Sequence, residues 1–251
     1  MTDEPAALFV FLHDSPPEWE DELNRYLDFD HLPDRISCEG WGHAERYARS
    51  EVAPADPRAP KYLYFHELTS PDALTSQARR HYTGSPWSRA QRAAPGPVAV
   101  APSRGDRTLW LRRPSPWEGS RVFRAPAPRT VLVVLRDVAA GHEDEANSYL
   151  DDVLVPELVT CPGFLGCERY EAGPALSGTP GSPPFVSPAL LDVFDLASPE
   201  VLTSEVHRSR AHALDRSPRT ETVRASLTVR AQGVYVQRPS PWAVDVRPRQ
   251  K

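Results

Sequence analysis

The chain has 251 residues, 40% of them hydrophobic, which suits one large globular domain or two small ones. A net charge of −5 provides no basic surface for nucleic acid or an anionic membrane, and no apolar run approaches the ~20 residues of a membrane span. The opening MTDEPAALFVFL lacks a basic start and a cleavage site, and the three cysteines show neither a disulfide framework nor a metal spacing. We therefore expect a cytoplasmic protein without metal, nucleic-acid or membrane partner.

The first half of the chain shows a regular series of elements. Four segments have strand patterns, either continuously apolar or alternating: Leu8–Leu12, Gly40–Tyr47, Lys61–Leu68 and Thr108–Arg112. Between the first two, apolar residues recur at helical spacing from Trp19 through Leu23 and Leu27. A second, short helix is expected from Ser70 and Pro71, a serine cap followed by proline. The predicted order is β-α-β-β-α-β, the ferredoxin-like arrangement.

The second half repeats the first. Residues 19–47 align without a gap with residues 142–170, with 13 identities in 29 positions. HELTSPDALTS at 66–76 matches FDLASPEVLTS at 194–204, and RPSPW occurs at 113–117 and 238–242. We therefore divide the chain into a first copy (1–117), a linker (118–129), a second copy (130–242) and a tail (243–251).

The duplication predicts the architecture. A four-stranded sheet with helices on one face leaves its other face bare, and a second copy can cover it. We expect an α+β protein in which two ferredoxin-like βαββαβ repeats pack sheet to sheet as one intramolecular barrel. Because the repeat supplies this pairing within one chain, a monomer is sufficient. The sequence leaves open whether two chains also form a homodimer.

Several segments in order resemble a known family. YLDFDHLPDR, CEGWGHAERY, PKYLYFHELTSPDAL and SPWSR are similar to the EthD-like branch of the dimeric α/β-barrel proteins. The resemblance covers most of the first copy and, more loosely, the second. It implies the same barrel and a group that includes polyketide cyclases and dehydratases, cofactor-free quinone-forming monooxygenases, lactone isomerases and heme-handling enzymes. Such a family predicts fold better than function.

The second copy departs from this pattern. Its acidic-His pair is replaced by Val153 and Leu154, and Asp215-Arg216 stands where Pro-Trp is usual. We interpret the second copy as a degenerate, structural one, and we expect the first copy to hold the larger cavity.

His31 is the first candidate for catalysis. It continues the i, i+4 row of Leu23 and Leu27 toward the interior, and its twin in the second copy is Leu154. A histidine at an apolar position needs a partner or a ligand, and its titration near neutrality suits proton transfer. The alternative is a core histidine bonded to a backbone carbonyl or to Asp30.

His66 is the second catalytic candidate, with Phe194 as its twin. Alternation along the strand places Tyr62, Tyr64 and His66 on one face, where they could line a cavity. The alternative is a polar seam between the sheets.

The remaining substrate-binding candidates are aromatic or histidine residues, of which Trp19 and Trp87 have no aromatic twin in the second copy. They are Trp19, Tyr26, His43 and Trp87, added to Tyr62 and Tyr64. His43 is expected on the same strand face as Trp41, Glu45 and Tyr47, and His13 is expected at the end of the first strand. For both histidines, the alternative is a structural or surface role.

Residues kept in both copies are assigned to folding. Glu45 and Arg46 recur as Glu168 and Arg169, which suggests cross-strand ion pairs. Asp28 and its twin Asp151 are placed on a solvated helix face.

Three functions remain open. The preferred one is a cofactor-independent acid/base enzyme, of cyclase, dehydratase or isomerase type, acting on a hydrophobic oxygenated small molecule such as an aromatic or polyketide-like intermediate. In it, His31 moves a proton while His66 or a tyrosine polarises a carbonyl. The alternatives are a non-catalytic small-molecule binding protein and a monooxygenase, either cofactor-free or with heme ligated by His31 or His66.

Overall fold

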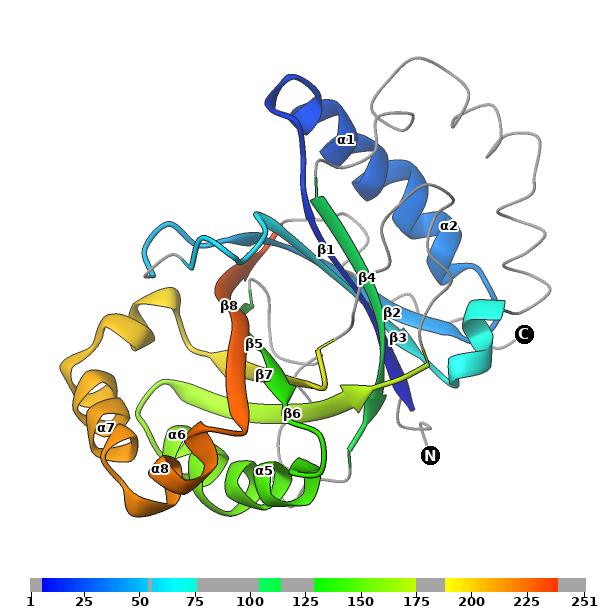
Figure 1. Cartoon of the computed structure of the whole chain (residues 1–251). Coiled ribbons are helices and arrows are strands. Elements are labelled where there is room, and N and C mark those ends of the chain that lie inside the picture. The colour runs from blue at the N-terminus through cyan, green and yellow to red at the C-terminus, as the bar shows by residue number, and fades with distance from the viewer. Residues whose placement is uncertain (1–5, 54–55, 76–103, 114–128, 175–187, 239–251) are drawn as a thin grey trace.

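The elements described in the first half recur in the same order in the second half (Figure 1). The computed structural model describes residues 6–53, 56–75, 104–113, 129–174 and 188–238. The first half comprises β1 (Ala7–Asp14), a 3₁₀ turn (Pro17–Trp19), α1 (Glu20–Tyr26), a π-helical turn (Leu27–His31), α2 (Leu32–Ile36), β2 (Trp41–Arg49), β3 (Tyr62–Leu68), a 3₁₀ turn (Pro71–Thr75) and β4 (Arg104–Arg112).

In the second half the series also includes two helices, α7 and α8, which correspond to a part of the first half outside the described residues. It comprises β5 (Thr130–Val138), α5 (Glu143–Tyr149), a π-helical turn (Leu150–Leu154), α6 (Val155–Val159), β6 (Phe164–Ala172), β7 (Leu190–Leu196), a 3₁₀ turn (Pro199–Thr203), α7 (Glu205–Asp215), α8 (Pro218–Arg224) and β8 (Leu227–Gln237). The α+β class is confirmed, whereas the helix expected from Ser70 is only a 3₁₀ turn in the described residues.

The eight strands form one closed antiparallel barrel in the order β1-β3-β2-β8-β5-β7-β6-β4. The two halves join along two edges. Tyr47 of β2 lies opposite Gln237 of β8, and Arg112 of β4 lies opposite Tyr170 of β6. Closing the sheet in this way removes the free edges that each half would expose alone.

The inner face of the barrel is a single core shared by both halves. It contains alternate residues of every strand: Leu8, Val10, Leu12, Tyr47, Leu63, Phe65, Trp110, Val131, Val133, Leu135, Tyr170, Leu191, Val193, Ala231 and Tyr235. The bare sheet face of each half is thus buried against the other half, which stabilises both by the hydrophobic effect.

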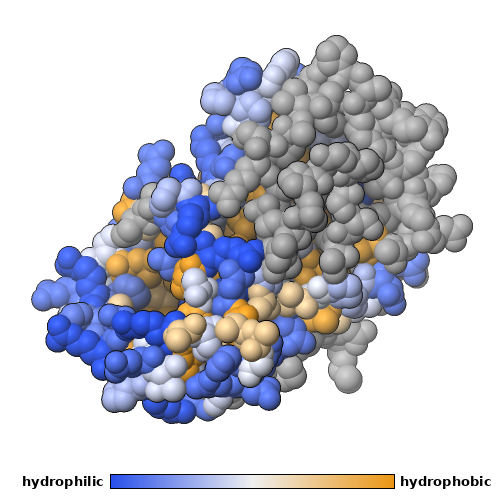
Figure 2. Space-filling model, viewed as in Figure 1, coloured by the Kyte–Doolittle hydropathy of each residue, from blue (hydrophilic) through white to orange (hydrophobic). Residues whose placement is uncertain are grey.

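Helices cover the outside of the barrel. In Figure 1, α1 and α2 lie on one side and α5 to α8 on the other. The exposed surface of α7 and α8 is mainly hydrophilic (Figure 2), as expected of helices that bury one face only. Among the described helices, none combines the length and the apolar character needed to pass through a bilayer.

Each half carries the same two irregularities. A π turn stands between the two short helices, and a proline follows it as the second residue of the next helix, Pro33 in α2 and Pro156 in α6. Proline has no N–H to continue the helical ladder, which accounts for the wider turn. The second irregularity is a register shift early in β2 and in β6, between Trp41 and Ala44 in the first half. Because both halves share them, these features belong to the scaffold.

Some segments and residues named in the sequence analysis lie outside the part of the chain that the structure describes. The linker 118–129 apart from Arg129, the tail 243–251 and Trp87 lie outside the described residues. The limits of the two copies therefore remain predictions.

Candidate functional site

Polar aromatic side chains gather on the outer face of the first half's sheet. Alternation along β3 puts Tyr62, Tyr64 and His66 on the face opposite the core residues Leu63 and Phe65, as predicted. On β1 their partners are His13, Phe11 and Phe9, respectively. This face lies under α1 and α2, so its polar groups are enclosed between sheet and helices.

His66 is at the centre of this cluster. Its ring centroid lies 4.8 Å from that of Trp41 and 4.6 Å from that of Tyr64, and the residue is 0% exposed. Neither ring nitrogen has a hydrogen-bond partner within the described part of the chain. Burial lowers the pKa of His66 well below its usual value, with further contributions from His31 and Arg35, so the imidazole is neutral at pH 7.

Tyr64 is the second buried group of this kind. Its hydroxyl also lacks a hydrogen-bond partner among the described residues. Burial raises the pKa of Tyr64, so the phenol is neutral and available as a donor. A buried polar group without a partner costs roughly 1–3 kcal/mol. Two of them side by side make this cluster the strongest candidate for a ligand site among the described residues.

His31 reaches the same cluster from the helical layer. It ends the π turn, is half-buried, and its ring lies 6.3 Å from Tyr64 and 5.8 Å from Tyr26. Arg35 of α2 donates a long hydrogen bond, 3.5 Å, from Nε to Nε2 of His31. Because Nε2 accepts, a neutral His31 carries its proton on Nδ1. The guanidinium of Arg35 also lies 5.5 Å from the Trp41 ring.

The structure thus brings His31, Tyr26, Tyr64 and His66 together and separates the other candidates. The hydroxyl of Tyr62 points to the helix, where it binds Glu20 at 2.5 Å and Asn24 at 3.1 Å.

Trp19 and His43 lie elsewhere. Trp19 is half-buried in the 3₁₀ turn before α1. The register shift in β2 separates His43 from Trp41: His43 turns to Glu45, with 3.1 Å between Nε2 and Oε1, while Trp41 contacts His66. The expectation that His43 and Trp41 share a face is therefore wrong.

A buried ion pair under the cluster was missed. Asp28 is buried and contacts Nη1 of Arg46 at 2.5 Å, and Asn24 accepts from Nη2 of Arg46 at 2.6 Å. The placement of Asp28 on a solvated face is wrong, because the row of Asn24 and Asp28 lies beside the buried row of Leu23 and Leu27. The available signal was identity, since Asn24, Asp28 and Arg46 all recur in the second half.

The second half fills the equivalent space differently. Asp192 stands in place of Tyr64 and binds both Arg169, at 3.1 Å, and Arg136, at 2.7 Å. Phe194 replaces His66 and packs edge-on against Phe164. At these positions the second half thus pairs its polar group internally, whereas the Tyr64 hydroxyl and the His66 ring nitrogens have no hydrogen bond among the described residues.

A heme, the group suggested by one branch of the resemblance, can be tested against these residues. The rings of Trp41 and Tyr64 occupy the space beside the His66 imidazole, and Nε2 of His31 accepts from Arg35. Ligation of iron by His31 would require Arg35 to leave Nε2, and ligation by His66 would require the adjoining rings of Trp41 and Tyr64 to move, so the described residues are not arranged to hold heme as they stand. They also contain no cluster of three or more His, Cys, Asp or Glu side chains arranged for a metal ion.

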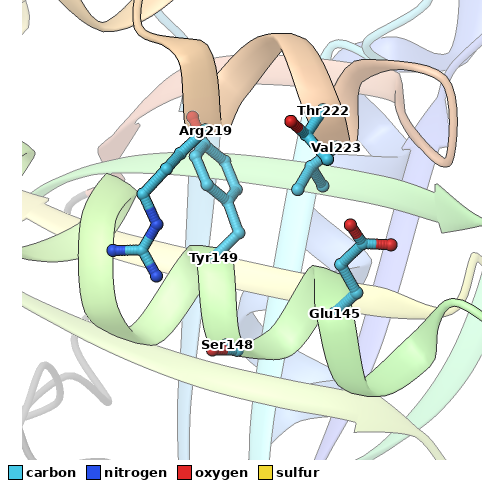
Figure 3. Close-up of a pocket in the computed structure, with 6 residues that line it drawn as sticks. All are labelled: Glu145, Ser148, Tyr149, Arg219, Thr222 and Val223. Atoms are coloured by element: carbon cyan, nitrogen blue, oxygen red, sulfur yellow. The ribbon is translucent and has the colours of Figure 1, made fainter.

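One pocket bounded by described residues lies in the second half, between α5 and α8 (Figure 3). It has a volume of about 220 Å³, and its wall includes Tyr149, whose hydroxyl binds Thr220 at 2.7 Å. In the first half, residues 76–103 lie outside the described part of the chain, so the larger cavity expected there stays a prediction.

Comparison with known proteins identifies the fold. No family model and no curated protein matches the chain. Similar solved structures include an anthrone oxidase-like protein, with 14% identity, a TM-score of 0.58 and coverage of 98% of this chain and 96% of that one. They also include a variant of chlorite dismutase from Candidatus Nitrospira defluvii in complex with cyanide, with 9% identity, a TM-score of 0.55 and coverage of 94% and 92%.

These similarities extend over almost the whole chain, and at such identities they establish the fold alone. The chain shares with these structures an α+β fold, here a closed antiparallel barrel of eight strands. Membership of the EthD-like branch remains a prediction.

Proposed function

We propose that the chain is an enzyme that removes a proton from an oxygenated aromatic small molecule bound among His31, Tyr64 and His66. The observation that carries the proposal is the adjacent pair of buried, unpartnered polar side chains, Tyr64 and His66. A ligand with a carbonyl and a hydroxyl group supplies one acceptor and one donor, which is what this pair lacks. The surrounding rings of Trp41 and Phe9 suit a flat, apolar body.

Each residue has a distinct role in this proposal. Tyr64 donates to the substrate carbonyl and stabilises the oxyanion that develops there. His66, kept neutral by burial, accepts a hydrogen bond from a substrate hydroxyl. His31 is half-buried, and its hydrogen bond from Arg35 is long, so Nε2 can take the proton once Arg35 moves away and can return it to solvent. Arg35 lies beside His31 and Trp41 and balances the charge of the substrate anion.

We further propose oxidation by dioxygen as the reaction that follows. Loss of a proton from a methylene group beside an aromatic ketone gives an anion that can reduce dioxygen. In the complete reaction, the methylene loses two hydrogens and becomes a carbonyl. One oxygen atom enters the product, and the other leaves as water. The fold shared with the anthrone oxidase-like protein supports this choice over the cyclisation, dehydration and isomerisation that begin with the same proton step.

The test is oxidation of anthrone itself. Oxygen uptake and the absorbance of the quinone product are followed with the purified protein, with His66→Phe and with a control, His142→Gln, in which an exposed histidine of the second half is changed. We expect turnover by the parent and the control, and its loss in His66→Phe, which installs the residue found in the second half.

Other outcomes discriminate the alternatives. Saturable binding of anthrone without turnover, abolished by His66→Phe, would identify a binding protein. Turnover that His66→Phe leaves unchanged would contradict the site.

A further inference from the structure

The same buried arginine recurs in both halves, but its carboxylate partners differ. In the second half, Arg169 binds Asp192 through Nε at 3.1 Å and also pairs with Asp151 through Nη1. In the first half, its counterpart Arg46 pairs with Asp28, with 2.5 Å between Nη1 and Oδ1. Within the part of the chain that the structure describes, Arg46 thus has one carboxylate partner where Arg169 has two.

Tyr64 stands where the missing carboxylate would be. The guanidinium carbon of Arg46 lies 5.9 Å from the centre of the Tyr64 ring. The Tyr64 hydroxyl is buried and has no hydrogen-bond partner among the described residues. An acceptor bound to the arginine in one half is therefore replaced in the other by a phenolic donor above the arginine. Such a donor bonds more strongly to a negatively charged oxygen than to a neutral one.

A second arginine of the first half depends on the same carboxylate. Nη2 of Arg238 lies 3.8 Å from Oδ2 of Asp28, whose Oδ1 is already bound by Arg46. The backbone N–H of Arg238 also donates to the carbonyl oxygen of Arg46 at 2.8 Å, which fixes the two arginines beside each other. Asp28 is therefore shared between two cations.

The corresponding arginine of the second half has a carboxylate of its own. The backbone N–H of Arg113 donates to the carbonyl oxygen of Arg169 at 3.0 Å, as Arg238 does to Arg46. Its side chain, however, binds Glu171 at 2.9 Å. In the first half, Ala48 stands at the position of Glu171, so Arg238 cannot be paired in this way.

The charges around these arginines balance in the second half only. There, three arginines face three carboxylates: Arg113, Arg136 and Arg169 bind Glu171, Asp192 and Asp151. In the first half, the two guanidinium groups of Arg46 and Arg238 face the single carboxylate of Asp28. Glu20 also acts on Arg238, but Lys61 already binds it at 2.6 Å. Among these described groups, the first half therefore has one excess positive charge, close to Tyr64.

We propose that the candidate site takes its ligand as an oxyanion, a phenolate or an enolate, and that Arg46 and Arg238 supply the positive charge that selects this form. The inference rests on the proposed function, because it concerns the same site at Tyr64. In the second half, Asp192 balances the buried arginine permanently. In the first half, the ligand oxyanion does so when it accepts the hydrogen bond of Tyr64. Arg46 acts through the Tyr64 ring without touching the ligand.

The pKa shifts of the two groups have the direction that this arrangement requires. Burial raises the pKa of Tyr64, the charges of Arg46 and Arg35 oppose this shift, and the smaller effect of Asp28 reinforces it. Burial lowers the pKa of Arg46 against the attraction of Asp28, and the charge of Arg238 lowers it further. A negative charge on a ligand atom bound to the Tyr64 hydroxyl would be attracted by the same cations.

The first experiment uses 4-nitrophenol, which has no methylene group to oxidise and whose anion, unlike its neutral form, absorbs visible light. The dye is titrated with the parent protein at a pH where both forms are equally abundant in solution. We expect the anion to bind about tenfold or more tightly than the neutral phenol. A dye that is bound mainly in its neutral form, or that shows no saturable binding, would overturn the proposal.

A pair of matched variants tests the source of the charge. The side chain of Arg238 is 31% exposed and its contact with Asp28 is long, so Arg238→Gln should fold as the parent does. We expect it to reduce the preference for the anion by about threefold or more. Arg113→Gln makes the same change in charge at the counterpart in the second half and should leave the preference unchanged. An unchanged preference in Arg238→Gln, or an equal reduction in both variants, would contradict the role of Arg238.

A comparison at position 64 tests the vacant partner position of Arg46 without any ligand. Tyr64→Asp installs the residue of the second half, and Tyr64→Asn has the same shape without the charge. An unpaired buried carboxylate is strongly destabilising, but here Arg46 can bind it as Arg169 binds Asp192. We therefore expect the Tm of Tyr64→Asp at neutral pH to equal or exceed that of Tyr64→Asn. A lower Tm would show that Arg46 does not accept a second carboxylate. The dye titration of the parent does not depend on the folding of these variants.

Failure of this inference and failure of the proposed function give different results. A parent protein that prefers the anion of 4-nitrophenol but does not oxidise anthrone would keep the oxyanion site and refute the reaction. A parent protein that oxidises anthrone without preferring the anion would keep the reaction and refute the oxyanion site.

Discussion

Tyr64 on β3 and Asp192 on β7 occupy equivalent positions in the two halves, and each lies against the arginine of its own half. The guanidinium of Arg46 is 5.9 Å from the Tyr64 ring, whereas Nε of Arg169 is 3.1 Å from Oδ1 of Asp192. In the second half, the arginine is thus paired with a carboxylate. In the first half, the same position holds a neutral phenol whose hydroxyl has no hydrogen bond among the described residues. The same scaffold therefore supports a closed, self-satisfied network in one half and an available donor in the other.

This contrast predicts that removing the two polar groups changes the free energy of unfolding by very different amounts. Tyr64→Phe should change the free energy of unfolding by less than about 1 kcal/mol, because no internal hydrogen bond is lost. Asp192→Ala should lower it by about 3–5 kcal/mol, because Arg136 and Arg169 lose a buried partner. Urea denaturation of both variants measures the difference. Equal losses would mean that Tyr64 has a structural bond of its own.

The stability of an Asp28 variant provides a second test, which concerns the buried pair of Asp28 and Arg46. A buried carboxylate paired with Arg46 predicts that Asp28→Ala costs about 3–5 kcal/mol. An acid on a solvated helix face would cost no more than about 0.5 kcal/mol. Asp152→Ala, an exposed acid in the π turn of the second half, is the matched control and should be close to neutral. A loss for Asp28→Ala no greater than that of the control would refute the buried pair.

Because buried His66 is neutral in the folded chain, we expect the stability of the fold to depend on pH in the acidic range. The folded pKa of His66 lies well below 6.5, so below pH 6.5 the unfolded chain binds a proton that the folded chain does not. This group therefore destabilises the fold as the pH falls from 6.5 toward the folded pKa. His66→Phe removes the effect and should raise Tm relative to the parent increasingly from pH 7 to pH 5. A difference that shrinks over this range would show that His66 is protonated in the folded protein.

Much of the fold follows from patterns that depend on short-range geometry. The apolar run at Leu8–Leu12 and the alternation before Leu68 identify β1 and β3, and the repeated segments give the second half the same order. Alternation also places Tyr64 and His66 correctly on one face, because β3 is regular throughout.

The errors coincide with irregular backbone and with long-range pairing. The register shift in β2 adds residues between Trp41 and Ala44, so simple alternation places His43 correctly beside Glu45 but puts Trp41 on the wrong face. The π turn similarly shifts His31 from the row of Leu23 and Leu27, which leaves it half-buried. Partners distant in sequence left no local signal, as with Glu45 and Arg129, which are 84 residues apart in the chain.

The most direct test of the proposed proton transfer is a single variant, His31→Leu, which installs the residue that the second half has at Leu154. Because His31 is half-buried and its hydrogen bond from Arg35 is long, at 3.5 Å, Tm and the free energy of unfolding should stay within about 1 kcal/mol of the parent. Turnover of anthrone, measured as oxygen uptake on the same preparation, should be abolished. A His31→Leu protein that is clearly destabilised yet oxidises anthrone at the parental rate would contradict the assignment of His31 as the proton acceptor.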